Sequence, residues 1–293
     1  MYAIRSVLII STLNSEPQLN SPAFPDILFY LCVLVVVLLA AGGNVINDYF
    51  DQKVDRINRP EKVIVGKLVK RRVAIIVHQV FNIVAVLLSI FLAFKSGVWW
   101  FVAIPVFTAT LLWIYSPILK KKVLIGNLSV AICVAIIPWW TGVFELHYLS
   151  DQTDAMFHPR RLYGYLENWI NAYTLFAFLL TLSRECIKDI EDIEGDSAEG
   201  YKTLPIVWGI GNSKFYSVVL QTLALCATVT GTWWLFSKEK ISTEFLIAAA
   251  VLVLLEMITI LKTYLAENKA QFHGASIWHK AVMGGGIAIL FFL

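Results

Sequence analysis

Residues 28–43 read LFYLCVLVVVLLAAGG, an unbroken apolar run that decides the fold class of this chain. A helix needs about 20 predominantly apolar residues to cross a lipid bilayer. The other structure that can span a membrane is a closed β-barrel, whose strands alternate apolar and polar residues. Residues 28–43 do not alternate, so they predict a membrane-spanning α-helix.

The composition extends this prediction to the whole chain. Its 293 residues are 58% hydrophobic and only 15% charged, whereas soluble domains carry about 25% charged residues. We therefore expect an all-α, polytopic membrane protein built as a single domain over residues 1–293. The apolar segments predict spans at 27–47, 73–94, 97–115, 123–144, 168–187, 213–236, 243–265 and 277–293. The short apolar stretch before Ser15 predicts a shortened first helix, which makes nine helices.

Lysine and arginine are unevenly distributed between the two sets of connections. Counting the N-terminus as inside, the inside connections hold most of them, including the cluster Lys120–Lys122, whereas the outside connections hold few. Positively charged loops face the cytoplasm. We therefore predict a multi-pass protein of the cell (inner) membrane whose acidic motifs, described next, face the cytoplasm.

The first acidic motif lies in GGNVINDYFDQKVDRINRP, residues 42–60. Asp48, Asp51 and Asp55 stand at i, i+3 and i+7, which places them on one stripe of a helix. Asn47 and Asp51, at i and i+4, are a suitable oxygen pair for Mg²⁺. Arg59 follows and can bind a phosphate with two parallel hydrogen bonds. The alternative is a solvated helix end with mixed charges.

The second acidic motif, in SRECIKDIEDIEGDSAEGYKTLPIVWG (183–209), repeats this spacing. Asp189, Asp192 and Asp196 again form a stripe, and further glutamates increase the negative charge. Such a cluster repels itself strongly unless a cation neutralises it. Lys188 and Lys202 flank it and suit phosphate oxygens.

A third polar segment, YSPILKKKVLIGN (115–127), is expected on the same inside face. It follows the helix that ends at Tyr115 and carries Lys120 and Lys121. A plain positively charged anchor explains it equally well. The functional interpretation is that Tyr115 and one or two of the lysines contact a diphosphate.

The order of the three segments resembles a known family. N-D-x-x-D-x-x-x-D before NRP, a Y-S-P-x-L-K turn, and D-x-x-D-x-x-x-D before K-T-L-P are similar to the motifs of the UbiA superfamily of intramembrane prenyltransferases. The similarity covers nearly the whole chain. It implies a nine-helix bundle with acidic motifs at 44–60 and 185–203. The second motif most resembles the digeranylgeranylglyceryl phosphate synthase branch, whereas the N-terminus lacks the Arg-Pro-x-Asn-like segment of many members.

The resemblance also implies roles for individual residues. Asn47, Asp51, Asp192 and Asp196 would be the main Mg²⁺ ligands, with Asp55 in support. The implied diphosphate-binding residues are Arg59, Lys120, Lys121, Lys188 and Lys202. Asp48 and Asp189 would be supporting ligands or acid–base residues, and we expect them, with Tyr115, to be the catalytic residues.

The expected reaction is Mg²⁺-dependent transfer of an isoprenyl group from a prenyl diphosphate to a lipophilic acceptor in the membrane. The acceptor indicated by the second motif is a geranylgeranylglyceryl phosphate, and the transferred group is geranylgeranyl. Alternative acceptors are an aromatic quinone precursor, such as 4-hydroxybenzoate or dihydroxynaphthoate, or a chlorophyllide- or haem-type molecule. No nucleic-acid or protein partner is expected.

Two other classes of protein also place acids in membranes. A transporter would hold them near the bilayer midplane, whereas these motifs are expected near one surface with basic residues beside them. A CDP-alcohol phosphotransferase would have small residues and arginine between its acids, and this pattern is absent here.

Overall fold

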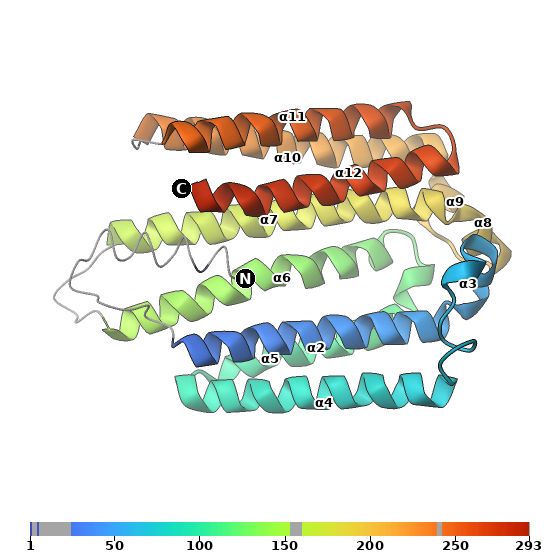
Figure 1. Cartoon of the computed structure of the whole chain (residues 1–293), viewed down its shortest axis with the longest axis horizontal. Coiled ribbons are helices and arrows are strands. Elements are labelled where there is room, and N and C mark those ends of the chain that lie inside the picture. Colours follow the sequence, from blue (N-terminus) through green and yellow to red (C-terminus); the bar gives the residue numbers. More distant parts are fainter. Residues whose placement is uncertain (2–4, 6–24, 153–159, 239–241, 293) are drawn as a thin grey trace. The chain divides into compact units, whose positions relative to one another are not determined.

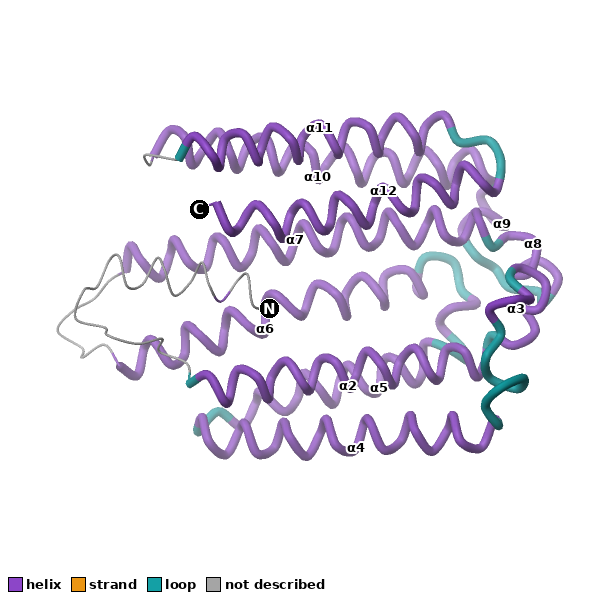
Figure 2. The backbone as a smooth tube through the Cα atoms, viewed as in Figure 1, coloured by secondary structure: helices purple, strands orange, loops and turns teal. Residues whose placement is uncertain are grey.

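The computed structural model describes residues 1, 5, 25–152, 160–238 and 242–292 (Figure 1). The chain divides into two compact units, which we describe separately. The motif unit comprises residues 24–129 and 192–203, and the bundle unit comprises residues 1–23, 130–191 and 204–293. Every named element in the described ranges is an α-helix or a 3₁₀-helix (Figure 2).

The motif unit is built on α2 (Asp26–Phe50), which packs against α4 (Arg71–Ser96) and α5 (Ala103–Tyr115). One face of α2 is buried, since its buried residues recur at spacings of three and four: Phe29, Cys32, Val35, Leu39, Gly42 and Ile46. In a bilayer such a stripe stabilises helix packing through van der Waals contacts with the neighbouring helices. At Gly42 the backbone carbonyl accepts a hydrogen bond from Nδ1 of buried His78, 2.9 Å away, which fixes α2 to α4 one turn before the first motif.

Short helices complete the motif unit. These are α3 (Gln52–Asn58), η1 (Pro60–Lys62), η2 (Trp99–Val102), η3 (Leu119–Lys121) and α8 (Ile193–Ala198). The residue that ends α4, Gly97, has φ +73°, a left-handed conformation that glycine adopts without steric cost. The chain can therefore turn sharply between α4 and η2.

The bundle unit is centred on four packed helices: α7 (Arg160–Glu191), α10 (Ile210–Lys238), α11 (Thr243–Leu265) and α12 (Lys269–Ala288). It also contains most of α6 (Ile125–Gln152), the short α9 (Leu204–Trp208) and η4 (Ile289–Phe292). A buried polar network joins three of the four central helices. Ser183 of α7 lies 2.8 Å from the hydroxyl of Ser217 on α10 and 3.0 Å from Nε2 of His279 on α12.

The expected all-α membrane class is confirmed, but the count of nine helices is not matched. Within the described ranges, six helices are long and apolar enough to cross a membrane: α2, α4, α6, α10, α11, and α12 with η4. The expected spans 97–115 and 168–187 fall on the shorter α5 and on α7. Except for Met1 and Arg5, the expected first helix lies outside the described residues.

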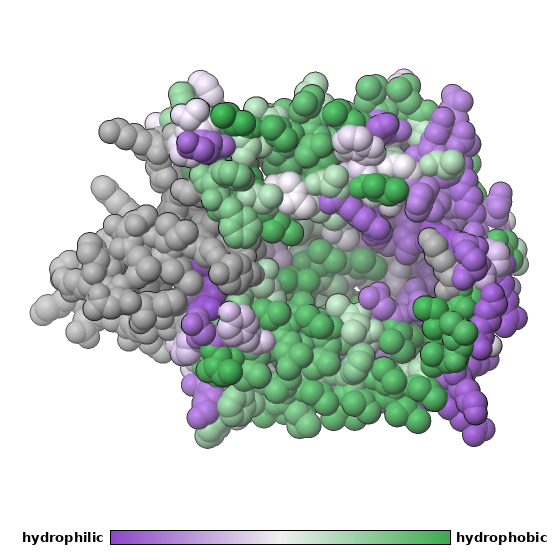
Figure 3. Space-filling model, viewed as in Figure 1, coloured by the Kyte–Doolittle hydropathy of each residue, from purple (hydrophilic) through white to green (hydrophobic). Residues whose placement is uncertain are grey.

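The surface of α4 has the character expected of a lipid-facing helix. Its exposed large side chains include Ile76, Leu87 and Phe94. In Figure 3 hydrophobic atoms run along α4, and hydrophilic residues gather at the end that lies beside α3. The polar end of the motif unit is therefore the end that carries the first acidic motif.

Candidate active site

The first acidic motif continues from α2 into α3 through Asp51. This residue has φ −81° and ψ 0°, which separates the two helices by one residue. Helical hydrogen bonds nevertheless run across the break, from the N–H of Asp51 to the carbonyl of Asn47 and from the N–H of Asp55 to the carbonyl of Asp51. The predicted stripe of Asp48, Asp51 and Asp55 is therefore preserved.

Asp51 is the centre of a buried cluster in the motif unit. It is 2% exposed, and its Oδ2 accepts a hydrogen bond of 2.7 Å from the amide of Asn47. The same oxygen forms an ion pair with the ammonium group of Lys120 in η3. We call η3 (Leu119–Lys121) the lysine turn. The first motif and the lysine turn therefore meet at one carboxylate, although Asp51 and Lys120 are 69 residues apart in sequence.

The second motif binds to the end of α3. Nη2 of Arg59 lies 3.0 Å from Oδ1 of Asp192. Asn58, which the sequence did not single out, donates to the carbonyl of Asp192 at 3.0 Å and accepts from the N–H of Gly195 at 3.1 Å. A Cβ atom at Gly195 would lie 2.5 Å from Nδ2 of Asn58, so only glycine allows this approach.

The lysine turn also contacts the second motif. The N–H of Lys202 donates to the carbonyl of Lys121 at 2.9 Å, and the ammonium of Lys121 lies 5.2 Å from the ring centroid of Tyr201. Both lysine side chains are exposed. The motif unit therefore brings together the first motif, the lysine turn and residues 192–203.

Further predicted site residues lie near the C-terminal ends of α2, α5 and α7. Asp48 is exposed on the last turns of α2, and Tyr115 is the last residue of α5. Half-buried Lys188 and Asp189 lie on the last turn of α7, which belongs to the bundle unit. The second acidic stripe is split between the two units, because α7 ends at Glu191 and α8 begins after Asp192.

Several pKa values in the motif unit are shifted, because the groups are buried and carboxylates lie close together around Lys120. Burial, followed by the negative charge of Asp51, raises the pKa of Asp55 above its ordinary value. Burial alone would lower the pKa of Lys120. The charge of Asp51, together with those of Tyr115 and Asp196 and the hydrogen bond to Asp51, more than offsets burial and raises that pKa. Burial and then Asp51 also raise the pKa of Tyr201 to about 12.

The raised pKa of Asp55 predicts a pH-dependent stability. The folded state holds the proton of Asp55 more tightly than the unfolded state, so stability is lost as pH rises through the folded pKa. Asp55→Asn removes this ionisation. We expect the variant to have a higher melting temperature than the wild type at about pH 7 in metal-free buffer, with the gain shrinking toward about pH 4.

Thermal scanning of the detergent-purified protein measures this difference. Glu194→Gln, which neutralises an exposed acid on α8, is the matched control and should change the melting temperature little. A melting temperature for Asp55→Asn at or below that of the wild type at every pH would contradict the expected repulsion at position 55.

Oxygen atoms suited to a cation lie beside Asp51. In the described part of the chain, Oδ1 of Asn47 and Oδ1 of Asp51 are buried and have no hydrogen-bond partner. Buried oxygens without partners are costly. No group of three or more Asp, Glu, His or Cys side chains among the described residues has metal-centre geometry. The carboxylates of Asp51 and Asp192 are instead paired with Lys120 and Arg59.

These features define a class of protein: a multi-pass helical membrane protein with a site of carboxylates and basic side chains at the polar end of one unit. Comparison with known families makes the class specific. The model of the UbiA prenyltransferase family matches residues 9–279. The chain therefore belongs to the UbiA prenyltransferase family.

Curated relatives agree with this assignment. The chain is 35% identical over 199 residues to a protein of Thermococcus sibiricus named digeranylgeranylglyceryl phosphate synthase, a match that spans 68% of this chain and 63% of the relative. It is 31% identical over 260 residues to a protein of the same name from Methanosphaera stadtmanae, covering 88% of this chain and 83% of the relative.

Solved structures show the same fold. A structure of digeranylgeranylglyceryl phosphate synthase superposes with a TM-score of 0.63 at 24% identity, covering 98% of this chain and 91% of the other. A UbiA homologue from Archaeoglobus fulgidus bound to DMAPP and Mg²⁺ superposes with a TM-score of 0.54 at 14% identity, covering 100% and 96% of the two chains.

Proposed function

We propose that the protein transfers a geranylgeranyl group from geranylgeranyl diphosphate to a geranylgeranylglyceryl phosphate-type acceptor within the membrane. The family supports prenyl transfer, and the names of the relatives from Thermococcus sibiricus and Methanosphaera stadtmanae support this acceptor. We further propose that the site lies on the cytoplasmic side of the cell membrane, as the distribution of lysine and arginine indicates.

The observation that carries the proposal is the meeting of three segments in the motif unit. Lys120 pairs with Asp51, and Arg59 pairs with Asp192. A diphosphate with bound cations needs both kinds of group, because carboxylates hold the cations and ammonium or guanidinium groups hold the phosphate oxygens. A site for the acceptor alone would not need the carboxylates.

We propose Mg²⁺ as the cofactor. The unpartnered oxygens of Asn47 and Asp51 are of the type that Mg²⁺ prefers, and Asp55, Asp192 and Asp196 would complete the set of ligands. The Archaeoglobus fulgidus homologue, bound to DMAPP and Mg²⁺, supports this choice. When bound, Mg²⁺ stabilises the negative charge of the diphosphate leaving group as a Lewis acid.

The side chains of this protein would bind and orient the reactants. Lys120 and Arg59 donate hydrogen bonds to the diphosphate oxygens as the bond to the prenyl carbon breaks. Asp48 or Asp189 accepts the proton of the acceptor hydroxyl as the ether bond forms. The roles that we propose for the remaining residues are diphosphate contacts by Tyr115, Lys121, Lys188 and Lys202.

The test is an assay of the purified protein with labelled geranylgeranyl diphosphate and a panel of acceptors, with and without Mg²⁺. We expect an ether product with geranylgeranylglyceryl phosphate, formed only when Mg²⁺ is present. A product with 4-hydroxybenzoate or dihydroxynaphthoate instead would reassign the acceptor. No product with any acceptor, in protein that stays folded, would refute prenyl transfer.

A further inference from the structure

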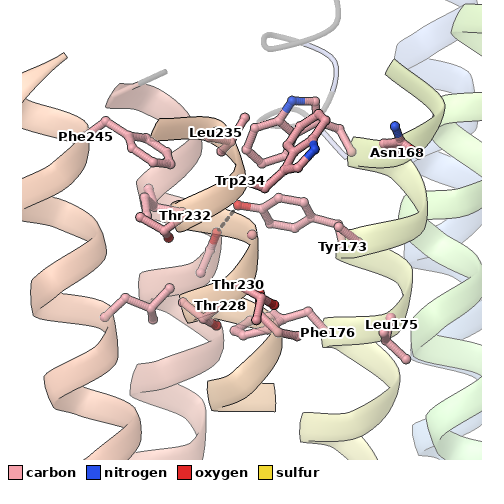
Figure 4. A pocket seen from close by; sticks show the side chains of 17 residues that line it. Asn168, Tyr173, Leu175, Phe176, Thr228, Thr230, Thr232, Trp234, Leu235 and Phe245 are labelled. Carbon is pink, nitrogen blue, oxygen red and sulfur yellow. Dashed lines mark hydrogen bonds between the residues drawn. The ribbon is translucent and has the colours of Figure 1, made fainter. Parts of the chain in front are cut away.

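A cavity of about 630 Å³ lies among α7, α10, α11 and α12 of the bundle unit (Figure 4). The part of α7 that lines it ends at Phe176, 13 residues before Asp189, which corresponds to about 20 Å along a helix. The cavity is thus separated along α7 from the acidic end of that helix. No proposed step of prenyl transfer uses the residues around it.

Two glycines line this cavity, and one of them faces open space. A Cβ atom at Gly231 of α10 would have no heavy atom within 4 Å, so it would enter open space. A Cβ atom at Gly286 of α12 would lie 2.4 Å from the ring of Phe176, so glycine there admits the aromatic ring. Helices in lipid usually approach closely at small residues, whereas here Gly231 leaves a hollow.

The walls of the cavity are largely apolar and aromatic. Figure 4 shows Trp234 and Phe245 toward one end and Phe176 toward the other. The lining side chains on α7 and α10 are partly accessible, with Leu175 49% and Trp234 42% exposed. Sites that enclose most of a small ligand have this character, and an apolar chain can enter from the side of α7 and α10.

Three hydroxyl groups of the lining donate their hydrogens within the protein. Oγ1 of Thr228 donates to Oε1 of Glu256 at 2.9 Å, Oγ1 of Thr230 to the carbonyl of Cys226 at 2.7 Å, and the hydroxyl of Tyr173 to the carbonyl of Gly286 at 2.8 Å (dashed in Figure 4). A hydroxyl has one hydrogen and two lone pairs. These groups can therefore only accept a hydrogen bond from a ligand.

The hydrogen of the Thr228 hydroxyl has two acceptors, Oε1 of Glu256 at 2.9 Å and the carbonyl of Ala224 at 3.1 Å. Glu256 lies in the middle of α11, is 3% exposed, and has an Oε2 atom without a hydrogen-bond partner among the described residues. A buried acid within a spanning helix is costly and usually functional. A neutral donor suits this wall better than an ammonium group, because transfer of a charge into an apolar cavity costs far more.

We propose that this cavity binds a long-chain alcohol. The chain lies against Phe176, Trp234 and Phe245, and the alcohol hydroxyl donates to Oγ1 of Thr228, whose own hydrogen is donated within the protein. Isoprenoid and straight-chain alcohols share this chemistry. The inference does not depend on the proposed prenyl transfer, and its test requires no turnover.

The test uses the full-length protein in lipid nanodiscs and a hexadecanol that carries a photoreactive diazirine, with crosslinks mapped by mass spectrometry. We expect crosslinks on the cavity-lining residues of α7 and α10. Gly231→Leu fills the open space and should reduce them at least ~10-fold. Gly284→Leu is the matched control, because Gly284 also has open space at its Cβ position but lies outside the lining.

Thr228→Val tests the hydroxyl contact. Loss of this acceptor should weaken crosslinking of the alcohol ~10-fold while leaving the corresponding hydrocarbon probe unchanged. Competition by unlabelled geranylgeraniol or by hexadecanol supports the proposal, and the stronger competitor identifies the chain type. Crosslinks that neither alcohol displaces, or that Gly231→Leu leaves intact, would overturn it.

Discussion

Asp51→Asn and Asp192→Asn are each expected to lower the kcat of prenyl transfer on the order of a thousandfold while leaving the protein folded and inserted. Each substitution keeps the shape of the side chain and removes the charge that we propose binds a cation. Both carboxylates lie in the motif unit, where Lys120 pairs with Asp51 and Arg59 with Asp192. The measurement is single-turnover product formation at saturating geranylgeranyl diphosphate and excess Mg²⁺.

A matched control separates this effect from a general loss of negative charge. Glu194 is an exposed acid two residues from Asp192, so Glu194→Gln changes the net charge equally and should keep wild-type turnover. The melting temperature of all three variants shows whether they remain folded. Wild-type kcat in both aspartate variants would remove these residues from the site.

Much of the fold follows from hydropathy, because span length and lipid exposure are properties of single helices. The run 28–43 lies within α2, and each of the seven further expected spans overlaps a described helix. The last expected span begins at 277, but α12 begins at Lys269. Its first two turns are polar, and the side chain of Asn268 caps them by accepting from the N–H of Gln271. Hydropathy alone therefore does not predict that these polar residues are helical.

The candidate site was predictable in part. The spacing of Asp48, Asp51 and Asp55 depends on helical geometry alone and persists through the break at Asp51. Which cation pairs with which carboxylate depends on contacts over more than 60 residues, as between Lys120 and Asp51 (|i−j| = 69), and the sequence alone does not specify them.

Asn58 shows the limit of motif spacing. It forms two of the hydrogen bonds that hold Asp192 and Gly195 against α3. The spacing of its neighbours in sequence does not distinguish it from a residue at a solvated helix end. Its place beside Arg59, together with the glycine at 195, was the available signal. The cavity beside Gly231 could not be predicted from the sequence, because open space depends on how the helices pack.

Lys120→Met is expected to affect stability and activity together. Asp51 is 2% exposed and the side chain of Lys120 is 17% exposed, so the variant leaves a buried carboxylate without its cation. Removal of one partner of a buried pair costs about 3–5 kcal/mol, which lowers the melting temperature by roughly 5–10 °C. Loss of the proposed hydrogen-bond donor to the diphosphate should also lower kcat/KM about 100-fold. Thermal scanning and the prenyl-transfer assay measure the two effects.

A second substitution separates the two roles of Lys120. Asp51→Asn/Lys120→Met removes both charges and should recover most of the melting temperature without recovering turnover, because the buried carboxylate is then absent. Lys122→Met, at an exposed lysine in the same turn, is the control for loss of positive charge.

Mg²⁺ should raise the melting temperature of Lys120→Met more than that of the wild type, since a bound cation would then be the main counter-charge for Asp51. Equal melting temperatures for the single and double variants would show that the Lys120–Asp51 pair does not stabilise the motif unit.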